Sequence, residues 1–419
     1  MIALIQPGRR MGVINVPASK SDAQRAILVA ALVPDTSRVY NYGSSDDVKA
    51  MISCIQELGA ICSLSEDFIE IRGLNIFPEK VCFNCGESGL SFRLLAALSM
   101  VLKGDFELHG RDSLLSRDHS FIEAFGLGRS VQVQSNNGQI PYIIKGRIEE
   151  EIYTIDAGIT SQFLSGLLIA LPLQGRKIKI FADKITSKPY LLMSLKTVAE
   201  FGVNIDFDGI GKFEIPSSTK YSPANYLVEG DWSAASYWIV ACILGHELTI
   251  KGLSNVSFQA DRSITKLLSS LGIEYDLTDG CFSPPKAPLS GFDFDATQCP
   301  DLFPALTALA VNCSGTSRIR GVHRLINKET DRSNALVSEF KKLGANIYIE
   351  DDVLCIKSCD LKGGVIVESH GDHRIAMCLA IAALNLNEEL TINDADVVSK
   401  SYPMFWRDLN NLIRKKKGA

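Results

Sequence analysis

One structural pattern repeats along the chain at intervals of about 70 residues. Each repeat begins with an apolar run of helical length, followed by a turn and a short strand rich in β-branched or aromatic residues. An interval this long exceeds one turn of a solenoid, so each repeat is expected to be a small α/β module. The first halves lie at Gln24–Tyr40, Ser91–Leu108, Ser161–Phe181, Ala234–Ile250, Leu302–Ile319 and His373–Ile392.

The second half of each module predicts an amphipathic helix that ends at a glycine and leads into a strand hairpin. Six modules in 419 residues favour two domains of three modules each. The sixth module has no hairpin after its last helix, whereas Ile2–Ile5 and Val13–Val16 are strands without a module. We therefore expect the N-terminus to complete the sixth module. The predicted domains are residues 18–228 and a discontinuous C-terminal domain of residues 1–17 plus 229–419.

Composition excludes several classes of protein. A formal net charge of −5 gives no sign of a nucleic-acid or membrane partner. No secretory signal follows Met1, and no apolar run reaches the length of a membrane span. Eleven cysteines without a disulfide framework are typical of a reducing compartment, so we expect a cytoplasmic protein. Neither the lone pair Cys82 and Cys85 nor the residues around His370 have the spacing of a metal site.

Polar and charged residues gather in the loops before equivalent helices of the six modules. If the modules share a fold, these loops converge, and helix N-termini together with cations favour bound anions. We therefore expect a small polyanionic substrate. For any one residue, a helix cap or a solvated cation is an alternative reading. The cations in these loops are Lys20, Arg25, Arg117, Lys328, Arg332, Arg374 and Lys400.

Two acids stand among these cations. Asp301 opens an apolar helix, where an N-cap role is the alternative, and Glu329 lies between Lys328 and Arg332, where an ion pair is the alternative. Acids placed beside bound anions suit proton transfer, because a general acid or base must reach the reacting atoms. Asp331, at the end of the same charged loop, is expected to cap the next helix.

With these residues in view, the chain resembles the EPSP synthases (3-phosphoshikimate 1-carboxyvinyltransferases) of the enolpyruvyl transferase family. The resemblance covers nearly the whole chain in order. It rests on Ala18-Ser19-Lys20-Ser21 with Arg25, Gly86-Glu87-Ser88-Gly89 with Arg93, Ser161-Gln162-Phe163-Leu164, Ser187-Lys188-Pro189-Tyr190, Glu229-Gly230-Asp231, Lys328-Glu329-Thr330-Asp331-Arg332, Asp372-His373-Arg374 and Lys400.

This resemblance implies an α/β (α+β) fold: an inside-out α/β barrel of two domains, each built from three βαβαββ units with pseudo-threefold symmetry. The domains would close over the substrates, with the active site in the cleft between them. The implied reaction moves the enolpyruvyl group of phosphoenolpyruvate to the 5-hydroxyl of shikimate 3-phosphate and releases phosphate. It passes through a tetrahedral intermediate in the shikimate pathway, which leads to chorismate and aromatic amino acids. It needs no metal or organic cofactor, and we expect a monomer.

Matching positions carry the family's roles onto this sequence. Asp301 matches the base at the 5-hydroxyl, Glu329 the residue that handles the proton of C3, and Lys20 a third catalytic group. The implied contacts to shikimate 3-phosphate are Lys20, Ser21, Arg25, Thr160, Ser161, Gln162, Ser187, Tyr190, Asp301 and Lys328. The implied contacts to phosphoenolpyruvate are Lys20, Gly89, Arg117, Gln162, Arg332, Arg374 and Lys400.

The sequence departs from the family pattern at two of these places. Arg117 is followed by Asp118 and His119 where the family usually has proline, and Thr160 replaces the first serine of a pair. The main alternative is the sister enzyme that transfers the same group to UDP-N-acetylglucosamine, but residues 108–117 lack the cysteine of that enzyme's flexible loop. A second alternative is a homologue that keeps the fold without the activity.

Overall fold

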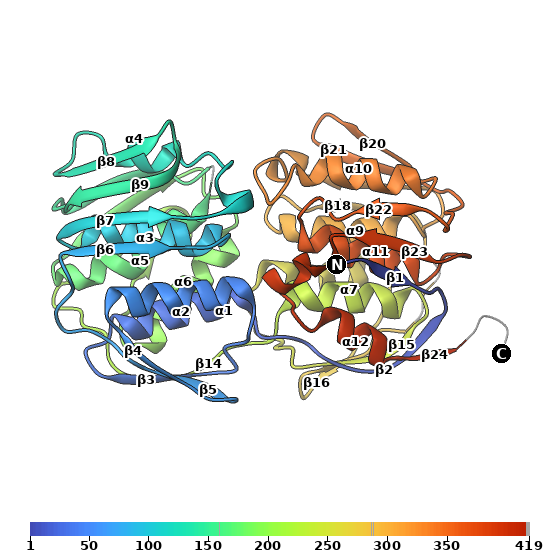
Figure 1. Cartoon of the computed structure of the whole chain (residues 1–419), viewed down its shortest axis with the longest axis horizontal. Helices are drawn as coiled ribbons and strands as arrows, with labels where there is room; N and C mark the ends of the chain where they lie inside the picture. The colour runs from blue at the N-terminus through green and yellow to red at the C-terminus, as the bar shows by residue number, and fades with distance from the viewer. Residues whose placement is uncertain (159, 286, 288, 416–419) are drawn as a thin grey trace. The chain divides into compact units, whose positions relative to one another are not determined.

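The computed structural model describes residues 1–415 except positions 159, 286 and 288 (Figure 1). The chain divides into two compact units. The N-terminal unit is Ala18–Val228, and the C-terminal unit consists of Met1–Pro17 and the chain from Glu229 onward. All six expected helix–strand runs contain a helix followed by a strand.

Within its described residues, the N-terminal unit contains three four-stranded sheets of one topology. In each sheet an edge strand runs parallel to the second strand, which is antiparallel to one arm of a hairpin. In sheet order, the strands are β14 (Asn225–Leu227), β3 (Thr36–Tyr40), β5 (Phe68–Arg72) and β4 (Ile61–Leu64); β6 (Lys80–Asn84), β7 (Gly104–His109), β9 (Gln139–Gly146) and β8 (Val131–Asn136); and β10 (Ile152–Asp156), β11 (Ile178–Asp183), β13 (Lys212–Ile215) and β12 (Asp206–Phe207).

The helices of the N-terminal unit fill its interior, because the first helix of each module is apolar on nearly all sides. The strands alternate buried and exposed residues, so each sheet covers the helices with one face (Figure 1). Gly166 allows a close approach of two helices, since a Cβ there would lie 2.6 Å from the Cβ of Ala97. The helices are α1 (Lys20–Ala31), α2 (Asp46–Leu58), α3 (Gly89–Val101), α4 (Ser120–Gly126), α5 (Ser161–Ala170) and α6 (Lys188–Glu200), with 3₁₀ turns η1 (Asp112–Leu114) and η2 (Leu171–Gln174).

The C-terminal unit repeats this plan with variations at its first and third sheets. In sheet order, its described strands are β16 (Leu277–Thr278), β17 (Cys281–Phe282), β15 (Glu247–Lys251), β2 (Arg9–Asn15) and β24 (Ile413–Lys415); β18 (Asp293–Asp295), β19 (Thr316–Arg320), β21 (Val353–Lys357) and β20 (Asn346–Glu350); and β1 (Ala3–Ile5), β23 (Leu390–Asn393) and β22 (Ile366–Glu368).

From the sequence we expect both N-terminal strands to belong to the sixth module, and this is wrong for the second of them. β1 does pair antiparallel with β23 of the sixth module. β2 instead lies parallel to β15, in the position that the parallel edge strand takes in the modules of the N-terminal unit. The chain also forms β24 after its last helix, where no strand was expected, and this strand pairs antiparallel with β2. Residues 416–417 of the basic tail lie outside the described residues.

Three helices form the interior of the C-terminal unit: α7, α9 and α11 pack against one another and are buried along their whole length. Their apolar composition leaves no solvent face, as expected of core helices. The helices and 3₁₀ turns of this unit are α7 (Trp232–Ile243), η3 (Ala260–Ser263), α8 (Ile264–Ser270), η4 (Pro300–Leu302), α9 (Phe303–Ala310), η5 (Val322–Arg324), α10 (Arg332–Lys342), α11 (His373–Ala383), η6 (Ala395–Lys400) and α12 (Phe405–Asn411).

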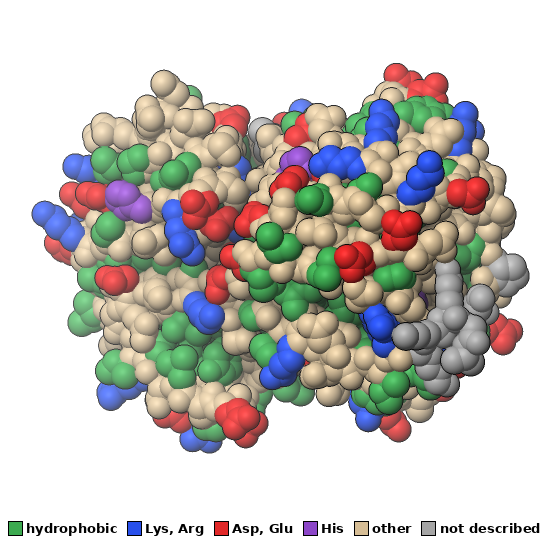
Figure 2. Space-filling model, turned by 45° about the vertical axis from the view of Figure 1, so that its right-hand side comes forward, with side chains coloured by type: hydrophobic (Ala, Val, Ile, Leu, Met, Phe, Trp, Pro, Cys, Tyr) green, Lys and Arg blue, Asp and Glu red, His purple; other side chains and the backbone are tan. Residues whose placement is uncertain are grey.

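The surface agrees with the weak net charge. On the face drawn in Figure 2, acidic and basic side chains are interspersed, with apolar side chains between them. Over the described part of the chain, none of the helices has the length and apolar character that a membrane span requires.

Candidate active site

Arg332 is the centre of a cluster of charged side chains in the C-terminal unit. It is the first residue of α10, and Asp331 caps this helix by accepting a hydrogen bond from the backbone N–H of Asn334, as the sequence predicted. The Arg332 side chain is 1% exposed. Its Nε donates to Asp372 at 2.8 Å, one Nη to Asp301 at 2.9 Å and the other to Glu329 at 2.7 Å.

Asp301 receives three cationic donors. Besides Arg332, Lys328 donates to it at 3.1 Å and Arg374 at 3.1 Å. Burial by itself would raise the pKa of Asp301, but Arg374, Lys328 and Arg332 together hold it well below its usual range. The carboxylate is therefore ionised at neutral pH. Its side chain keeps 21% exposure, so a ligand can reach it.

Asp301 does not cap a helix, which was the alternative role expected from the sequence. Asp301 is the middle residue of the turn η4, and α9 begins two residues later without a side-chain cap. Its carboxylate is used by the charged cluster instead. Glu329 does form an ion pair, with Arg332, and its side chain is 11% exposed. The ion pair holds the Glu329 carboxylate beside Arg332, and it does not exclude a role for Glu329 in proton transfer.

Asp372 holds two elements in place with one carboxylate. It is the N-cap of α11: one oxygen accepts from the backbone N–H of Arg374 at 2.8 Å, and the other accepts from Arg332. Burial lowers the pKa of Arg374, but Asp301 and its neighbours raise it well above the ordinary value. Lys400 is buried at the end of η6, which packs on the same helix α11. We call Asp301, Lys328, Glu329, Arg332, Asp372 and Arg374 the Arg332 cluster.

A buried acid next to this cluster was given no role from the sequence. Asp261, in the turn η3, accepts a hydrogen bond from the hydroxyl of Ser233 on α7. Burial, and next the charge of Asp301, raise the pKa of Asp261 to about 7. Asp261 and Asp372 both lie in the loops before helices, and Asp372 belongs to the Asp372-His373-Arg374 motif, but neither acid was assigned a role from the sequence.

In the N-terminal unit, one group of predicted residues gathers between α1 and α6. Lys20 begins α1, and its Nζ lies 2.8 Å from a carboxylate oxygen of Asp47 on α2. Arg25 is buried, donating from Nε to Ser194 at 2.7 Å and from an Nη to the carbonyl of Ser21 at 2.7 Å. Burial lowers its pKa to about 10, so the guanidinium stays charged at neutral pH.

Two further residues of this group come from the start of α6. The guanidinium carbon of Arg25 lies 6.0 Å from the centre of the Tyr190 ring. Ser187 precedes α6 in a left-handed conformation, with φ of 53°, and is buried. A non-glycine residue held at positive φ marks a constrained backbone, as is common at ligand sites.

A second group lies at the starts of α3 and α5. Gly89 begins α3, and a Cβ at this position would lie 2.8 Å from an Nη of Arg117 and 3.2 Å from an Nη of Arg93. Arg93 donates to the amide oxygen of Gln162 at 2.6 Å. Two guanidinium groups are thus held within about 6 Å of each other beside a bare backbone position, an arrangement that suits an anion.

The start of α5 supplies the remaining predicted contacts. Thr160 caps this helix, accepting from the backbone N–H of Gln162 at 3.2 Å, so the replacement of serine keeps a hydroxyl that is used. Ser161 follows it and is buried.

The departure at 117–119 is accommodated by burial of the histidine. His119 packs on Phe92 with ring centres 4.5 Å apart, and burial, then Arg93 and Arg117, lower its pKa to about 2. His119 is therefore a neutral core residue. Arg117 stays buried beside Gly89, with an Nη donating to Ser113 at 3.2 Å.

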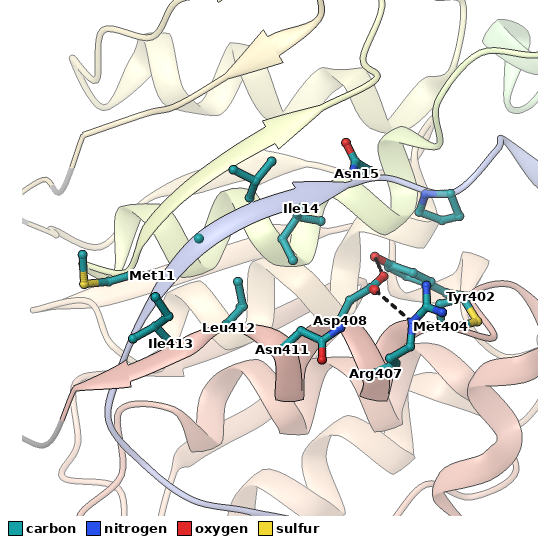
Figure 3. Close-up of a pocket in the computed structure, with 13 residues that line it drawn as sticks. Met11, Ile14, Asn15, Tyr402, Met404, Arg407, Asp408, Asn411, Leu412 and Ile413 are labelled. Carbon is teal, nitrogen blue, oxygen red and sulfur yellow. Dashed lines mark hydrogen bonds and ion pairs between the residues drawn. The ribbon is translucent and has the colours of Figure 1, made fainter.

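A cavity of about 480 Å³ in the C-terminal unit contains none of the predicted site residues (Figure 3). It lies between β2 and α12, where Tyr402 donates to Asp408 at 2.7 Å. Its charged lining is the pair Arg407 and Asp408, which lie 3.9 Å apart. One neutralised ion pair gives no binding site for a substrate with several negative charges.

Known proteins resemble this chain over nearly its whole length. The sequence profile of the family described as EPSP synthase (3-phosphoshikimate 1-carboxyvinyltransferase) matches residues 5–409. The 3-phosphoshikimate 1-carboxyvinyltransferase of Clostridium acetobutylicum is 37% identical over 417 residues, covering 97% of this chain and 96% of the relative. The enzyme of the same name from Clostridium kluyveri is 33% identical over 411 residues, with the same coverage.

Solved structures show the same fold. The EPSP synthase of Acinetobacter baumannii superimposes with a TM-score of 0.79 at 22% identity, covering 98% of this chain and 97% of that one. The enolpyruvyl transferase NikO of Streptomyces tendae gives 0.75 at 19% identity, covering 99% and 97%. The expected α/β fold of the enolpyruvyl transferases is therefore confirmed. By its full-length profile match and its relatives above 30% identity, the chain belongs to the EPSP synthase family.

Proposed function

We propose that this chain transfers the enolpyruvyl group of phosphoenolpyruvate to the 5-hydroxyl of shikimate 3-phosphate through the residues described above. The reaction is that of its family and of its named relatives. The substrate oxygen bonds to C2 of phosphoenolpyruvate while C3 gains a proton. The C2–O bond to phosphate then breaks while C3 loses a proton, giving 5-enolpyruvylshikimate 3-phosphate and phosphate.

The observation that carries the residue assignment is the sharing of Arg332 among three carboxylates. Asp301 and Glu329 are bound to different nitrogens of one guanidinium group, 2.9 and 2.7 Å away. The planar guanidinium sets the separation of the two acids. A substrate lying across Arg332 would have one acid near the attacking hydroxyl and the other near C3. We assign Asp301 as the base for the hydroxyl and Glu329 as the group that exchanges the proton of C3.

Binding of the anionic substrate would make Asp301 a better base. In the ligand-free protein, three cations hold its pKa well below the ordinary range, which weakens it as a proton acceptor. A carboxylate or phosphate that binds Arg332 and Arg374 offsets their charge and adds a like charge near Asp301. Both effects raise the pKa of Asp301. The base is thereby strengthened only when phosphoenolpyruvate is present.

The remaining cations are assigned to phosphoenolpyruvate. Arginine suits this role because its fork binds carboxylate and phosphate through two hydrogen bonds. Lys20, next to Asp47, is assigned to both substrates and to stabilising charge during transfer. With Gly89 and Gln162, which are uncharged, the residues assigned to phosphoenolpyruvate are Lys20, Gly89, Arg117, Gln162, Arg332, Arg374 and Lys400.

The group between α1 and α6 is assigned to shikimate 3-phosphate. Arg25 is charged, buried and fixed by two hydrogen bonds, so it binds an anion without first losing conformational freedom. Thr160 and Ser161 stand at a helix N-terminus, which favours a phosphate. Residues outside the group between α1 and α6 are included, so the full set assigned to shikimate 3-phosphate is Lys20, Ser21, Arg25, Thr160, Ser161, Gln162, Ser187, Tyr190, Asp301 and Lys328.

We also propose that the enzyme acts as a monomer in the cytoplasm. Every group with an assigned role comes from one chain, so a second copy is not needed. All eleven cysteines are free thiols, which suits a reducing compartment.

A phosphate-release assay tests the proposal. We expect release only when phosphoenolpyruvate and shikimate 3-phosphate are both present, with one phosphate formed for each 5-enolpyruvylshikimate 3-phosphate. A parallel reaction replaces shikimate 3-phosphate by UDP-N-acetylglucosamine. Phosphate release in that reaction alone would assign the chain to the sister activity, and release in neither would mean that the fold is kept without the activity.

A further inference from the structure

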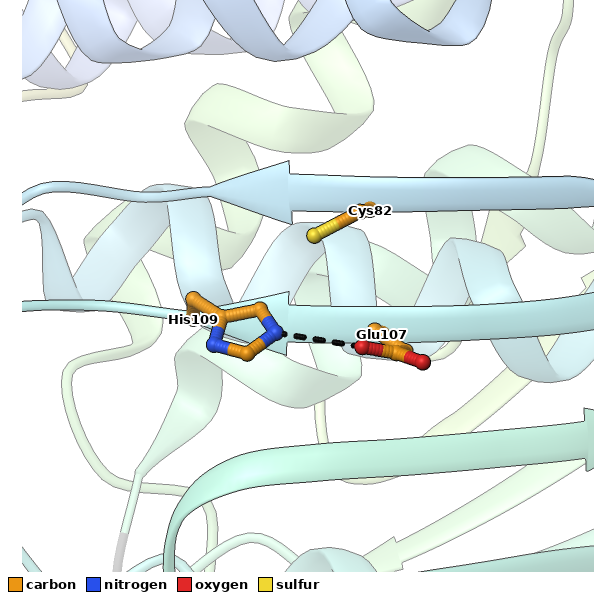
Figure 4. Close-up of side chains that lie close together, drawn as sticks. All are labelled: Cys82, Glu107 and His109. Atoms are coloured by element: carbon orange, nitrogen blue, oxygen red, sulfur yellow. Dashed lines mark hydrogen bonds and ion pairs between the residues drawn. The ribbon is translucent and has the colours of Figure 1, made fainter.

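A cysteine, a glutamate and a histidine, none of them with an assigned role, meet on the outer face of the N-terminal unit. Cys82 lies on β6, and Glu107 and His109 lie on β7 (Figure 4). One ligand atom from each of the three lies within 4.8 Å of the other two. Across the part of the chain that the structure describes, no other set of three metal-binding side chains is this close.

The sheet places these side chains together. β6 and β7 are parallel and adjacent, and Cys82 is the direct cross-strand partner of Glu107. His109 follows Glu107 by two residues, so both point to the same face. On each strand the alternate residues are buried, which leaves Cys82 and Glu107 exposed and His109 half-buried. A shift of the pairing by one residue would remove the cluster.

The distances suit a tetrahedral metal ion. Zinc binds cysteine sulfur at about 2.3 Å and nitrogen or oxygen at about 2.0 to 2.2 Å, so its ligand atoms lie about 3.3 to 3.6 Å apart. The Nε2 of His109 lies 3.3 Å from a carboxylate oxygen of Glu107. The sulfur is within 4.8 Å of both partners, and rotation of exposed side chains is enough to close the difference.

The backbone under the cluster is firmly held. The buried faces of the two strands pack together, with the rings of Phe83 and Phe106 stacked at 6.3 Å and nearly parallel. Val81 and Leu108 are buried on the same side. A site on such a sheet needs little ordering of the backbone when the ion binds.

The Cys82-x-x-Cys85 spacing is not the basis of this site. Cys85 is buried and lies directly after the end of β6. The partners of Cys82 come instead from the neighbouring strand.

We propose that the outer face of β6 and β7 binds one Zn²⁺-type divalent cation through Cys82, Glu107 and His109, with water as the fourth ligand. The thiolate and imidazole select zinc and similar transition metals over Mg²⁺ and Ca²⁺, which prefer oxygen ligands. The site is independent of enolpyruvyl transfer, and the transfer reaction needs no ion there.

Cobalt(II) titration of the full-length, reduced and chelator-treated protein tests this site. We expect one Co²⁺ per chain, with a sulfur-to-cobalt charge-transfer band and the intense visible bands of tetrahedral cobalt, both displaced by Zn²⁺. Cys82→Ser should abolish the charge-transfer band, and His109→Ala should lower the affinity at least about tenfold. Mg²⁺ in excess should displace nothing.

Two matched controls keep the test specific. Cys62→Ser removes a partly exposed thiol of the same unit, and His323→Ala removes a histidine paired with Asp352 without a cysteine; both should leave the spectrum unchanged. Absence of the band in the unmodified protein, or its persistence in Cys82→Ser, would overturn the proposal. Phosphate release should be the same with and without chelator, so failure of this site and failure of the proposed function give different results.

Discussion

Replacement of Gly89 by alanine tests whether the bare backbone at the start of α3 exists to hold Arg117 in place. The added Cβ would lie 2.8 Å from an Nη of Arg117 and 3.2 Å from an Nη of Arg93. An ordinary contact needs at least about 3.4 Å, so the Arg117 guanidinium must move by roughly 0.6 Å. The moving atoms are the end of a flexible side chain, so the protein should still fold.

The expected cost falls on phosphoenolpyruvate. If the displaced Arg117 loses one charge-assisted hydrogen bond to this substrate, the loss is about 1.5 to 3 kcal/mol, or about 10- to 150-fold in kcat/KM. The KM for shikimate 3-phosphate should change little. Gly89 is not among the glycines with positive φ, so alanine fits the backbone and thermal stability should stay the same or rise slightly.

Steady-state kinetics with phosphoenolpyruvate varied at saturating shikimate 3-phosphate measure the effect. A double-mutant comparison makes it specific: in an Arg117→Ala background, Gly89→Ala should add little, because the group it displaces is already absent. An unchanged kcat/KM for phosphoenolpyruvate, or losses that simply multiply in the double variant, would refute the reasoning.

Three other substitutions test the Arg332 cluster and its surroundings. Asp301→Asn keeps the size of the side chain but removes the base, so kcat should fall roughly 10²- to 10⁴-fold while phosphoenolpyruvate still binds. The control is Asp295→Asn, which changes an exposed aspartate on β18. Equal turnover in the two variants would remove Asp301 from the mechanism. Arg332→Lys removes hydrogen-bond donors from buried carboxylates, so the free energy of unfolding measured by urea titration should fall by about 3 to 5 kcal/mol. Arg318 is exposed, and the control Arg318→Lys should change this free energy by less than about 0.5 kcal/mol. The folded-state pKa of Asp261 is raised from 3.8 to about 7, so ionisation of this carboxyl destabilises the folded protein as the pH rises from about 4 to 7. The Asp261→Asn variant should therefore be more stable than the parent at pH 8 but not at pH 4. A difference in thermal unfolding that does not depend on pH would contradict the raised pKa of Asp261.

The sequence predicts those features of the structure whose determining interactions are local. The repeated helix–strand runs depend on the periodicity of nearby residues, and all six appear in the structure. The cap at Asp331 also depends on residues within one turn. Pairing of β2 with β15 joins residues more than 230 positions apart, for example Met11 with Glu247, and nothing local distinguishes that partner from the sixth module. The N-terminal strand was misplaced for this reason.

The same division applies to the candidate sites. The charged residues of the Arg332 cluster were found because they share one place in each module. Asp261 and Asp372 were named in these loops but were assigned no role, because only burial distinguishes them from ordinary capping residues. The cluster of Cys82, Glu107 and His109 could not be found from spacing, since Cys82 and Glu107 meet through the register of two strands separated by a whole helix.

The charges of the Arg332 cluster balance one another in the absence of substrate. Three carboxylates confined around one guanidinium would repel one another, and Lys328 and Arg374 supply the additional positive charge that keeps Asp301 ionised. The same cations are the groups assigned to the incoming anion. On this assignment, substrate would compete with Asp301 for donors, and each hydrogen bond that passes from Asp301 to the substrate would make Asp301 more basic. If Asp301 is the base that we propose, binding energy is thereby converted into proton affinity at the atom that accepts the proton.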